Sequence, residues 1–151
     1  MVSCPWHTLC YFRSLKGVVQ HRVIDMIEDN KSLYRVLIVD DDRAIGQILA
    51  DLLRAPHRSI DVRDTARAAL EFLQHNPIDL AFVDLMLPGM TGTTLAEKIR
   101  ERCPQAHVII CTGQPAEASA AEAHATKAER VLRKPLNLGE VLQLADTYTT
   151  E

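Results

Sequence analysis

Residues 80–92 read LAFVDLMLPGMTG, and this stretch decides the fold. Its opening residues, 80–83, form an unbroken apolar run, which is typical of a short strand buried on both faces of a parallel sheet. The run ends at Asp84, and the Pro88-Gly89 pair that follows predicts a loop. Open parallel sheets bind ligands beyond the carboxyl ends of their strands. Asp84 is therefore a candidate functional residue.

The same alternation of apolar runs and helical patterns continues on both sides of this stretch. Short apolar runs predict further strands at residues 36–39, 60–62, 108–111 and 131–132. Apolar side chains at helical spacing predict helices at residues 44–53, 66–73, 95–103 and 138–145, and the alanine-rich residues 116–125 predict one more. Five strands that alternate with five helices indicate an α/β fold, a doubly wound parallel sheet covered on both faces.

Residues 1–34 differ from the rest, because they carry aromatic and scattered basic side chains without a long amphipathic period. We expect an N-terminal extension that is poorly ordered or helical, or that reflects a start codon placed too early, with Met26 as the alternative start. The domain itself is predicted at residues 35–148, with residues 149–151 as a tail. A length of 151 residues and an apolar fraction of 47% suit one globular domain.

The bulk composition excludes several classes of protein. A net charge of −3 argues against a nucleic-acid or membrane surface, which needs a basic excess. No apolar run approaches the roughly 20 residues of a membrane span, and no secretory signal is present. The cysteines form no CxxC pair, and a cluster of Cys4, His7 and Cys10 lacks a fourth metal ligand. We expect free thiols in a reducing cytoplasm, at Cys4, Cys10, Cys103 and Cys111.

Three carboxylates in a row, Asp40-Asp41-Asp42, directly follow the first predicted strand. They and Asp84 should meet at the carboxyl edge of the sheet, although they are far apart in the sequence. Crowded carboxylates raise each other's pKa, and a hard cation such as Mg²⁺ relieves their repulsion. An acidic triplet after a strand is also common as a solvated loop or helix cap, and Asp42 is the one expected to be only a cap.

Two further polar groups follow later strands, Thr112 after the fourth and Lys134 after the fifth. A hydroxyl donor and an ammonium beside acids and a metal suit phosphoryl transfer, which depends chiefly on positioning and charge neutralisation. Asp84 would then be the nucleophile, and the product would be an aspartyl phosphate.

Taken together, these motifs resemble the receiver domain of bacterial response regulators, the family that serves two-component signalling. The resemblance covers roughly residues 35–148 and rests on VDD at 39–41, VDLMLPGMTG at 83–92, CTG at 111–113 and RKP at 133–135. It implies a flavodoxin-like fold with the strand order 2-1-3-4-5.

The resemblance also implies an Mg²⁺ site. Asp84 is expected to accept the phosphoryl group and to ligate the metal together with Asp41 and the backbone carbonyl of Met86. Asp40 is expected to act on the metal mostly through water.

By the same resemblance, Thr112 should hydrogen-bond a phosphoryl oxygen, and Lys134 should pair first with the acceptor and then with the phosphoryl group. Pro135 fits a cis-proline that the family places after this lysine. The chain departs from the family at Val131, where an aromatic switch residue is usual, and at Gly113, where alanine is common.

These features predict a phospho-accepting receiver in a two-component phosphorelay. A histidine kinase or a histidine phosphotransfer protein would supply the phosphoryl group, and a downstream protein would bind the phosphorylated form. We expect no catalytic activity beyond the protein's own phosphorylation and dephosphorylation, a cytoplasmic location, and no direct contact with nucleic acid or membrane. Because the chain ends near its last predicted helix, no output domain is expected. Residues 116–125 should carry the phosphorylation-dependent change.

Two other functions stay open. Asp40-x-Asp42 also fits the opening motif of a Mg²⁺-dependent phosphohydrolase of the haloacid-dehalogenase type. That family needs another acidic pair after its lysine, whereas residues 135–145 contain only Glu140, and Asp146 stands deep in the last predicted helix. The other alternative is a receiver-like binding module that is not phosphorylated. The partly apolar residues 85–90 suit either core packing or contact with a kinase.

Overall fold

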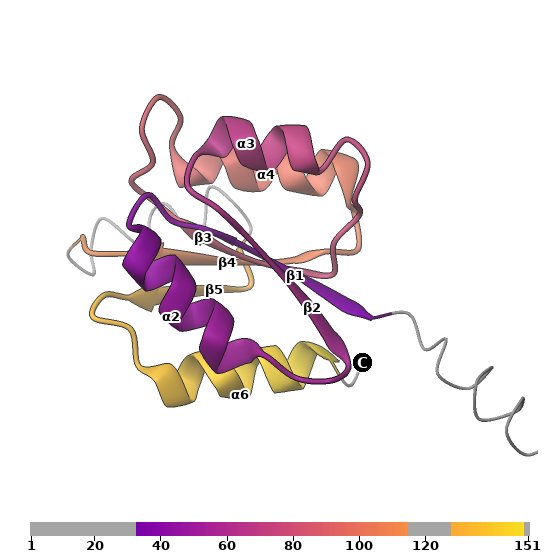
Figure 1. Cartoon of the computed structure of the whole chain (residues 1–151). Helices are drawn as coiled ribbons and strands as arrows, with labels where there is room; N and C mark the ends of the chain where they lie inside the picture. The colour runs from indigo at the N-terminus through magenta and orange to yellow at the C-terminus, as the bar shows by residue number, and fades with distance from the viewer. Residues whose placement is uncertain (1–32, 115–127, 150–151) are drawn as a thin grey trace, which may run out of the picture. The chain divides into compact units, whose positions relative to one another are not determined.

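The described part of the computed structural model, residues 33–114 and 128–149, is built around a five-stranded parallel sheet (Figure 1). The strand order is β2-β1-β3-β4-β5, which confirms the predicted topology. The strands are β1 (Tyr34–Val39), β2 (Arg58–Arg63), β3 (Leu80–Asp84), β4 (His107–Thr112) and β5 (Arg130–Arg133).

Within the described residues, four helices accompany the sheet: α2 (Arg43–Leu53), α3 (Ala66–Phe72), α4 (Gly92–Arg102) and α6 (Leu138–Thr149). The additional helix predicted at 116–125 lies outside the described residues. Residues 1–32 of the predicted extension also lie outside them. β1 begins at Tyr34, so the regular fold starts one residue earlier than the sequence indicated. None of the described helices is long and apolar enough to cross a membrane.

The interior strands of the sheet are the ones that the apolar runs marked most clearly. Every residue of β3 is buried, and so are residues 36–39 of β1 and 108–112 of β4. Such strands have no polar face because helices cover both sides of the sheet. The edge strands β2 and β5 are only partly buried, and both extend beyond their short apolar runs.

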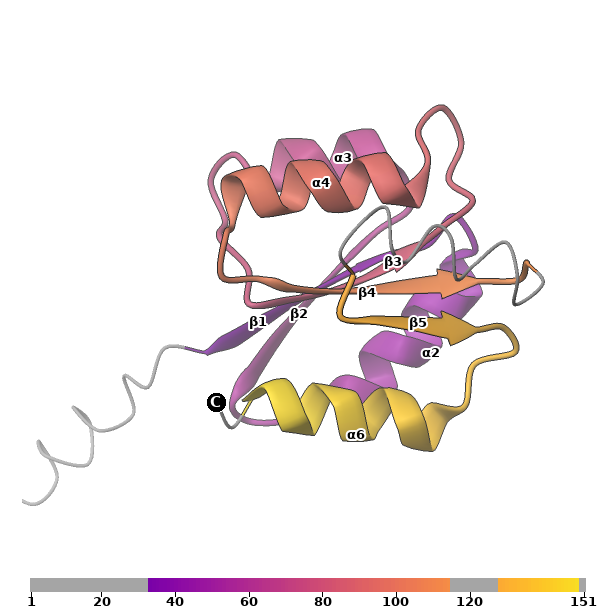
Figure 2. The ribbon, with the colours of Figure 1, turned by 180° about the vertical axis from the view of Figure 1, so that it is seen from behind.

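The helices cover the two faces in pairs, α3 and α4 on one face and α2 and α6 on the other (Figures 1 and 2). Leu95 and Ile99 of α4 pack with Val83 of β3 in the first of two buried clusters. Leu53 of α2 and Val141 of α6 belong to the second cluster, on the opposite face. Packing on both faces holds the carboxyl ends of the strands in fixed positions.

Side chains cap the helices that begin at this carboxyl edge. Asp42 is the N-cap of α2 and accepts hydrogen bonds from the amides of Ala44 and Ile45. Thr65 and Thr91 cap α3 and α4 in the same way. These caps satisfy backbone amides that have no partner inside the helix. Each cap therefore fixes the residue at which the loop from the carboxyl end of a strand stops and the next helix begins.

A buried arginine joins β2 to α6. The side chain of Arg58 is 2% exposed, and its Nη2 donates a hydrogen bond to Oδ1 of Asp146 at 2.5 Å. Asp146 lies 88 residues further along the chain, so this contact connects an early strand with the last helix.

Candidate functional site

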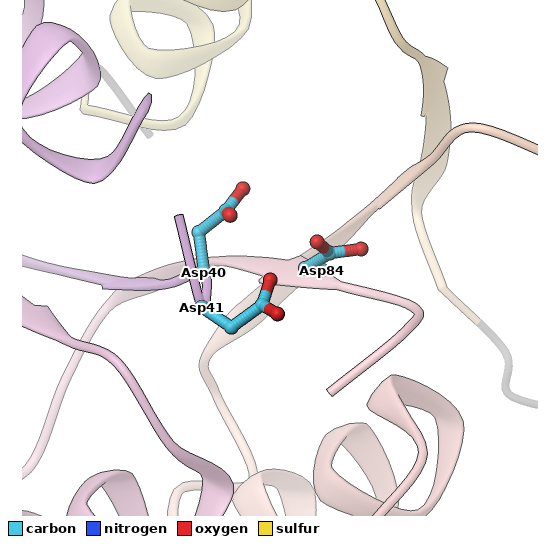
Figure 3. A group of neighbouring side chains, drawn as sticks. All are labelled: Asp40, Asp41 and Asp84. Carbon is cyan, nitrogen blue, oxygen red and sulfur yellow. The ribbon is translucent and has the colours of Figure 1, made fainter. Parts of the chain in front are cut away.

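Three carboxylates converge at the carboxyl edge of the sheet. Asp40 and Asp41 directly follow β1, and Asp84 is the last residue of β3. The pairing of Val39 with Val83 brings these two strand ends side by side. One carboxylate oxygen from each of the three aspartates lies within 4.8 Å of the others (Figure 3). The predicted meeting of the two acidic stretches is therefore confirmed by the geometry.

Burial distinguishes the members of this cluster. Asp40 and Asp84 are 2% and 6% exposed, whereas Asp41 is exposed. A buried carboxylate needs hydrogen bonds or an opposite charge, since removing it from water is costly. Oδ1 of Asp40 accepts a hydrogen bond from the amide of Asp42 at 3.0 Å. Oδ1 of Asp84 accepts one from the amide of Met86 at 3.0 Å.

Lys134 supplies the opposite charge. Its Nζ donates to Oδ2 of Asp84 at 2.6 Å and to Oδ2 of Asp40 at 2.9 Å. The end of β5 places this lysine, and its backbone amide donates to the carbonyl of Thr112 at 2.7 Å. The predicted pairing of Lys134 with Asp84 is confirmed. The peptide bond between Lys134 and Pro135 is cis, as expected.

Thr112 ends β4 beside these groups. Its neighbour Cys111 pairs with Asp84 across the sheet, and Thr112 is fully buried. Its Oγ1 accepts a hydrogen bond from the amide of Gln114 at 3.0 Å. A hydroxyl that accepts one bond keeps its own hydrogen for donation. The threonine is therefore available as the donor that the sequence predicted.

Gln114 is a site residue that the sequence did not reveal. Besides its backbone bond to Thr112, it donates from Nε2 to the Sδ of Met86 at 3.3 Å. The only available signal was its position two residues after Thr112, in the loop that leaves the functional edge. The metal-ligand role of the Met86 carbonyl remains a prediction, although the amide of Met86 contacts Asp84.

The structure also bears on the predictions for Asp42, for residues 85–90 and for Val131. Asp42 is a helix cap, as expected, and its backbone also supports Asp40. The stretch 85–90 is mixed, because Leu85 and Leu87 are buried in the core whereas Met86 is 60% exposed. Val131 is half-buried against the cluster beneath α3 and α4, so an aliphatic side chain occupies the usual aromatic position.

The cysteines of the described residues, Cys103 and Cys111, are free and buried, as predicted. Burial raises the pKa of the Cys111 thiol to about 12. This thiol therefore stays protonated and unreactive at neutral pH.

Burial and charge shift two titrations at the site. Burial raises the pKa of Asp40 above its ordinary value of 3.8, and the hydrogen bonds from Lys134 and Asp42 only partly offset it. Burial alone would lower the pKa of Lys134, but the hydrogen bonds to Asp84 and Asp40 outweigh it, and the pKa is raised. The lysine is therefore a permanent cation beside a carboxylate that ionises reluctantly.

A pH dependence of stability follows from Asp40. Without divalent metal, the free energy of unfolding of the wild-type protein should fall relative to that of Asp40→Asn as the pH rises above 3.8. The unfolded chain then loses its proton at a lower pH than the folded chain, so ionisation favours unfolding until the raised pKa is passed. Urea titrations with EDTA between about pH 4 and about pH 7 measure this difference. A relative stability that rises over this interval would contradict the prediction.

The donor set suits a hard divalent cation. Mg²⁺ prefers oxygen ligands and takes one or two carboxylates together with water or phosphate oxygens. Asp41 is exposed and next to Asp84, whereas Asp40 is engaged by Lys134 and by the amide of Asp42. This arrangement fits direct ligation by Asp41 and Asp84, with Asp40 acting through water.

The site and the fold agree with comparisons to known proteins. The response regulator receiver domain family matches residues 36–146. The regulatory protein VanR of Enterococcus faecium is 32% identical over 108 residues, which cover 72% of this chain and 46% of VanR. The response regulator protein FleR of Pseudomonas aeruginosa is 38% identical over 111 residues, which cover 73% of this chain and 23% of FleR.

A solved structure, a CheY-like response regulator receiver domain protein from Methanospirillum hungatei, has a TM-score of 0.70 and 29% sequence identity. The match covers 79% of this chain and 98% of that chain. The chain therefore belongs to the response regulator receiver domain family of two-component systems. It spans less than half the length of VanR and of FleR.

Proposed function

We propose that this receiver domain accepts a phosphoryl group on Asp84 in a Mg²⁺-dependent reaction and thereby acts as a phosphorylation switch. The observation that carries the proposal is the ammonium of Lys134, which lies 2.6 Å from Asp84 and 2.9 Å from Asp40 at a cluster of three carboxylates. A nucleophile, a neutralising cation and a metal-binding donor set within one site are the components of phosphoryl transfer.

Asp84 supplies the nucleophile. One of its carboxylate oxygens forms a bond to phosphorus while the bond between phosphorus and the donor's leaving atom breaks, and the leaving group takes that electron pair. Lys134 holds Asp84 in place beforehand and lies close enough to neutralise the new phosphoryl oxygens afterwards. The hydroxyl of Thr112 keeps a hydrogen for donation to one of these oxygens.

Asp41, Asp84 and the carbonyl of Met86 would hold Mg²⁺, with Asp40 in support. The bound ion would neutralise charge on the phosphoryl oxygens. The proposal is supported by carboxylate oxygens within 4.8 Å of one another and by the hard, oxygen-only donor set.

The partners follow from the chemistry and from the family. A histidine kinase or histidine phosphotransfer protein would donate the phosphoryl group in the cytoplasm, and a downstream protein would recognise the phosphorylated domain. No direct contact with nucleic acid or membrane is proposed. The domain would catalyse only its own phosphorylation and dephosphorylation, because the phosphoryl group would stay on Asp84 until it is hydrolysed.

Intact-mass measurement after incubation with Mg²⁺ and acetyl phosphate tests the function. The proposal expects one added phosphoryl group, which disappears with time. Turnover of many phosphoesters without stable modification would favour the phosphohydrolase, and no modification would favour a binding module. The phosphohydrolase is disfavoured by Asp146, which lies within α6 and pairs with Arg58.

Mg²⁺ should raise the melting temperature of the wild-type protein, because the ion binds the folded carboxylate cluster better than the unfolded chain. Asp41→Asn should largely abolish this shift, since it removes the exposed ligand from the cluster. The matched control is Asp42→Asn, which keeps the helix cap and lies outside the cluster, and it should preserve the shift. Thermal scans with and without Mg²⁺ measure the effect. An unaltered shift in Asp41→Asn would place the metal elsewhere.

A further inference from the structure

We infer that the thioether of Met86 is a modification site for hydroperoxides, and that its oxidation to the sulfoxide shortens the lifetime of the phosphorylated domain. The second half of this inference rests on the proposed phosphorylation of Asp84. The first half stands on the position of the methionine alone.

Met86 belongs to a chain of contacts around the acceptor site. Its amide donates to Oδ1 of Asp84 at 3.0 Å, and its Sδ accepts from Nε2 of Gln114 at 3.3 Å. The amide of Gln114 donates in turn to Oγ1 of Thr112 at 3.0 Å. Met86 and Gln114 thus connect the loop after β3 with the end of β4, and connect the acceptor with the hydroxyl proposed to bind its phosphoryl group.

Exposure distinguishes Met86 from the other sulfur-containing residues that the structure describes. Met86 is 60% exposed, whereas Met90, in the same loop, is partly buried against the core. Cys103 and Cys111 are buried, and the raised pKa of Cys111 keeps that thiol out of its reactive thiolate form. Among the described residues, Met86 is therefore the most exposed residue that carries sulfur, and we expect it to react first with an oxidant.

The reaction is balanced with a hydroperoxide as the oxidant. The sulfur lone pair attacks the outer peroxide oxygen, an S–O bond forms, and the O–O bond breaks to release an alcohol or water. The sulfur is oxidised by two electrons, and the peroxide is reduced by two. Methionine sulfoxide reductases, which use thiols, reverse this reaction.

Oxidation changes the chemistry of a side chain whose own backbone amide contacts Asp84. The thioether is a weak acceptor, whereas the sulfoxide is polar and chiral. Nε2 of Gln114 would donate to the new oxygen instead of the sulfur. Gln114 would then shift, and with it the hydrogen bond from its amide to Oγ1 of Thr112. A polar sulfoxide would also attract water to the loop after β3, whose backbone contacts the buried Asp84. Faster hydrolysis of the aspartyl phosphate is the expected result.

The experiment uses the full chain and hydrogen peroxide as the probe. Peptide mapping by mass spectrometry should show the sulfoxide at Met86 well before Met90. Phosphorylation with acetyl phosphate and Mg²⁺, followed by removal of the donor, should show a several-fold shorter lifetime in the oxidised protein. Met86→Leu should lose this response, and Met90→Leu should keep it. Met86→Gln, which places a polar side chain there, should shorten the lifetime without peroxide.

Each outcome decides the inference. Oxidation of Met90 as fast as Met86 overturns the modification site. Preferential oxidation of Met86 with an unchanged or longer lifetime overturns the effect on phosphorylation, and so does a response that persists in Met86→Leu. If the untreated wild-type protein gains no phosphoryl group, the proposed function fails and the effect on lifetime fails with it, while the peptide map still decides the modification site.

Discussion

The Asp84→Asn protein should gain no phosphoryl group from acetyl phosphate and Mg²⁺ under conditions that phosphorylate the wild-type protein completely. An amide nitrogen and a neutral carbonyl oxygen replace the carboxylate, so the nucleophilic oxygen is lost. Loss of a nucleophile commonly lowers a rate by about 10⁶-fold, which is effectively complete in this assay. Intact-mass spectrometry measures the modified fraction directly.

Asp64→Asn is the matched control for this change. Asp64 lies in the loop after β2, where it pairs with the exposed Arg43 at 2.7 Å, and it is not a member of the carboxylate cluster. This variant should be phosphorylated like the wild-type protein. Full phosphorylation of the Asp84→Asn protein at another residue would refute the assignment of the acceptor.

Gly92→Ala should destabilise the domain by about 3 kcal/mol or more, because overpacking against backbone cannot be relieved by a rotamer change. A Cβ at this position would overlap the carbonyl oxygen of Asp84 and lie 2.8 Å from Cα of Leu85. The amide of Gly92 also donates to the carbonyl of Leu85 at 2.8 Å, which holds the start of α4 against the end of β3. Urea unfolding measures the loss of stability.

Gly113→Ala provides the control, since a Cβ at Gly113 meets no atom within 4 Å. This substitution should change the free energy of unfolding by less than about 1 kcal/mol. If Gly92→Ala keeps near wild-type stability, the phosphorylation rate separates two explanations. A slower reaction would show that α4 has moved and displaced Asp84, whereas an unchanged rate would refute the close contact.

The bounds of the interior strands of the sheet were predictable from the sequence, whereas the bounds of the edge strands were predicted less accurately. The apolar runs in β1, β3 and β4 predicted these strands to within two residues, because both faces of each strand are covered. β2 was predicted only at residues 60–62, yet it runs from Arg58 to Arg63. Arg63 at its end is compatible with a strand because an edge strand pairs on one side only and remains partly exposed, whereas Arg58 at its start is buried and pairs with Asp146.

The part of the candidate site that lies at the strand ends was predictable for a different reason. Parallel strands bring their carboxyl ends to one edge, so the positions of Asp40, Asp84, Thr112 and Lys134 after successive strands indicated their convergence. The contact of Gln114 with Met86 was not predictable, because it depends on the paths of two loops and on two flexible side chains. The same holds for Arg58, whose polar side chain is buried through a contact with Asp146.

The contact between Arg58 and Asp146 has a consequence for how the domain forms on the ribosome. Arg58 emerges early in synthesis, whereas the carboxylate that contacts it follows 88 residues later. Val141 and Ala145, on the same helix as Asp146, are fully buried against the sheet. The nascent chain can therefore assemble its central strands early, but that face of the sheet is completed only after the last helix has left the exit tunnel.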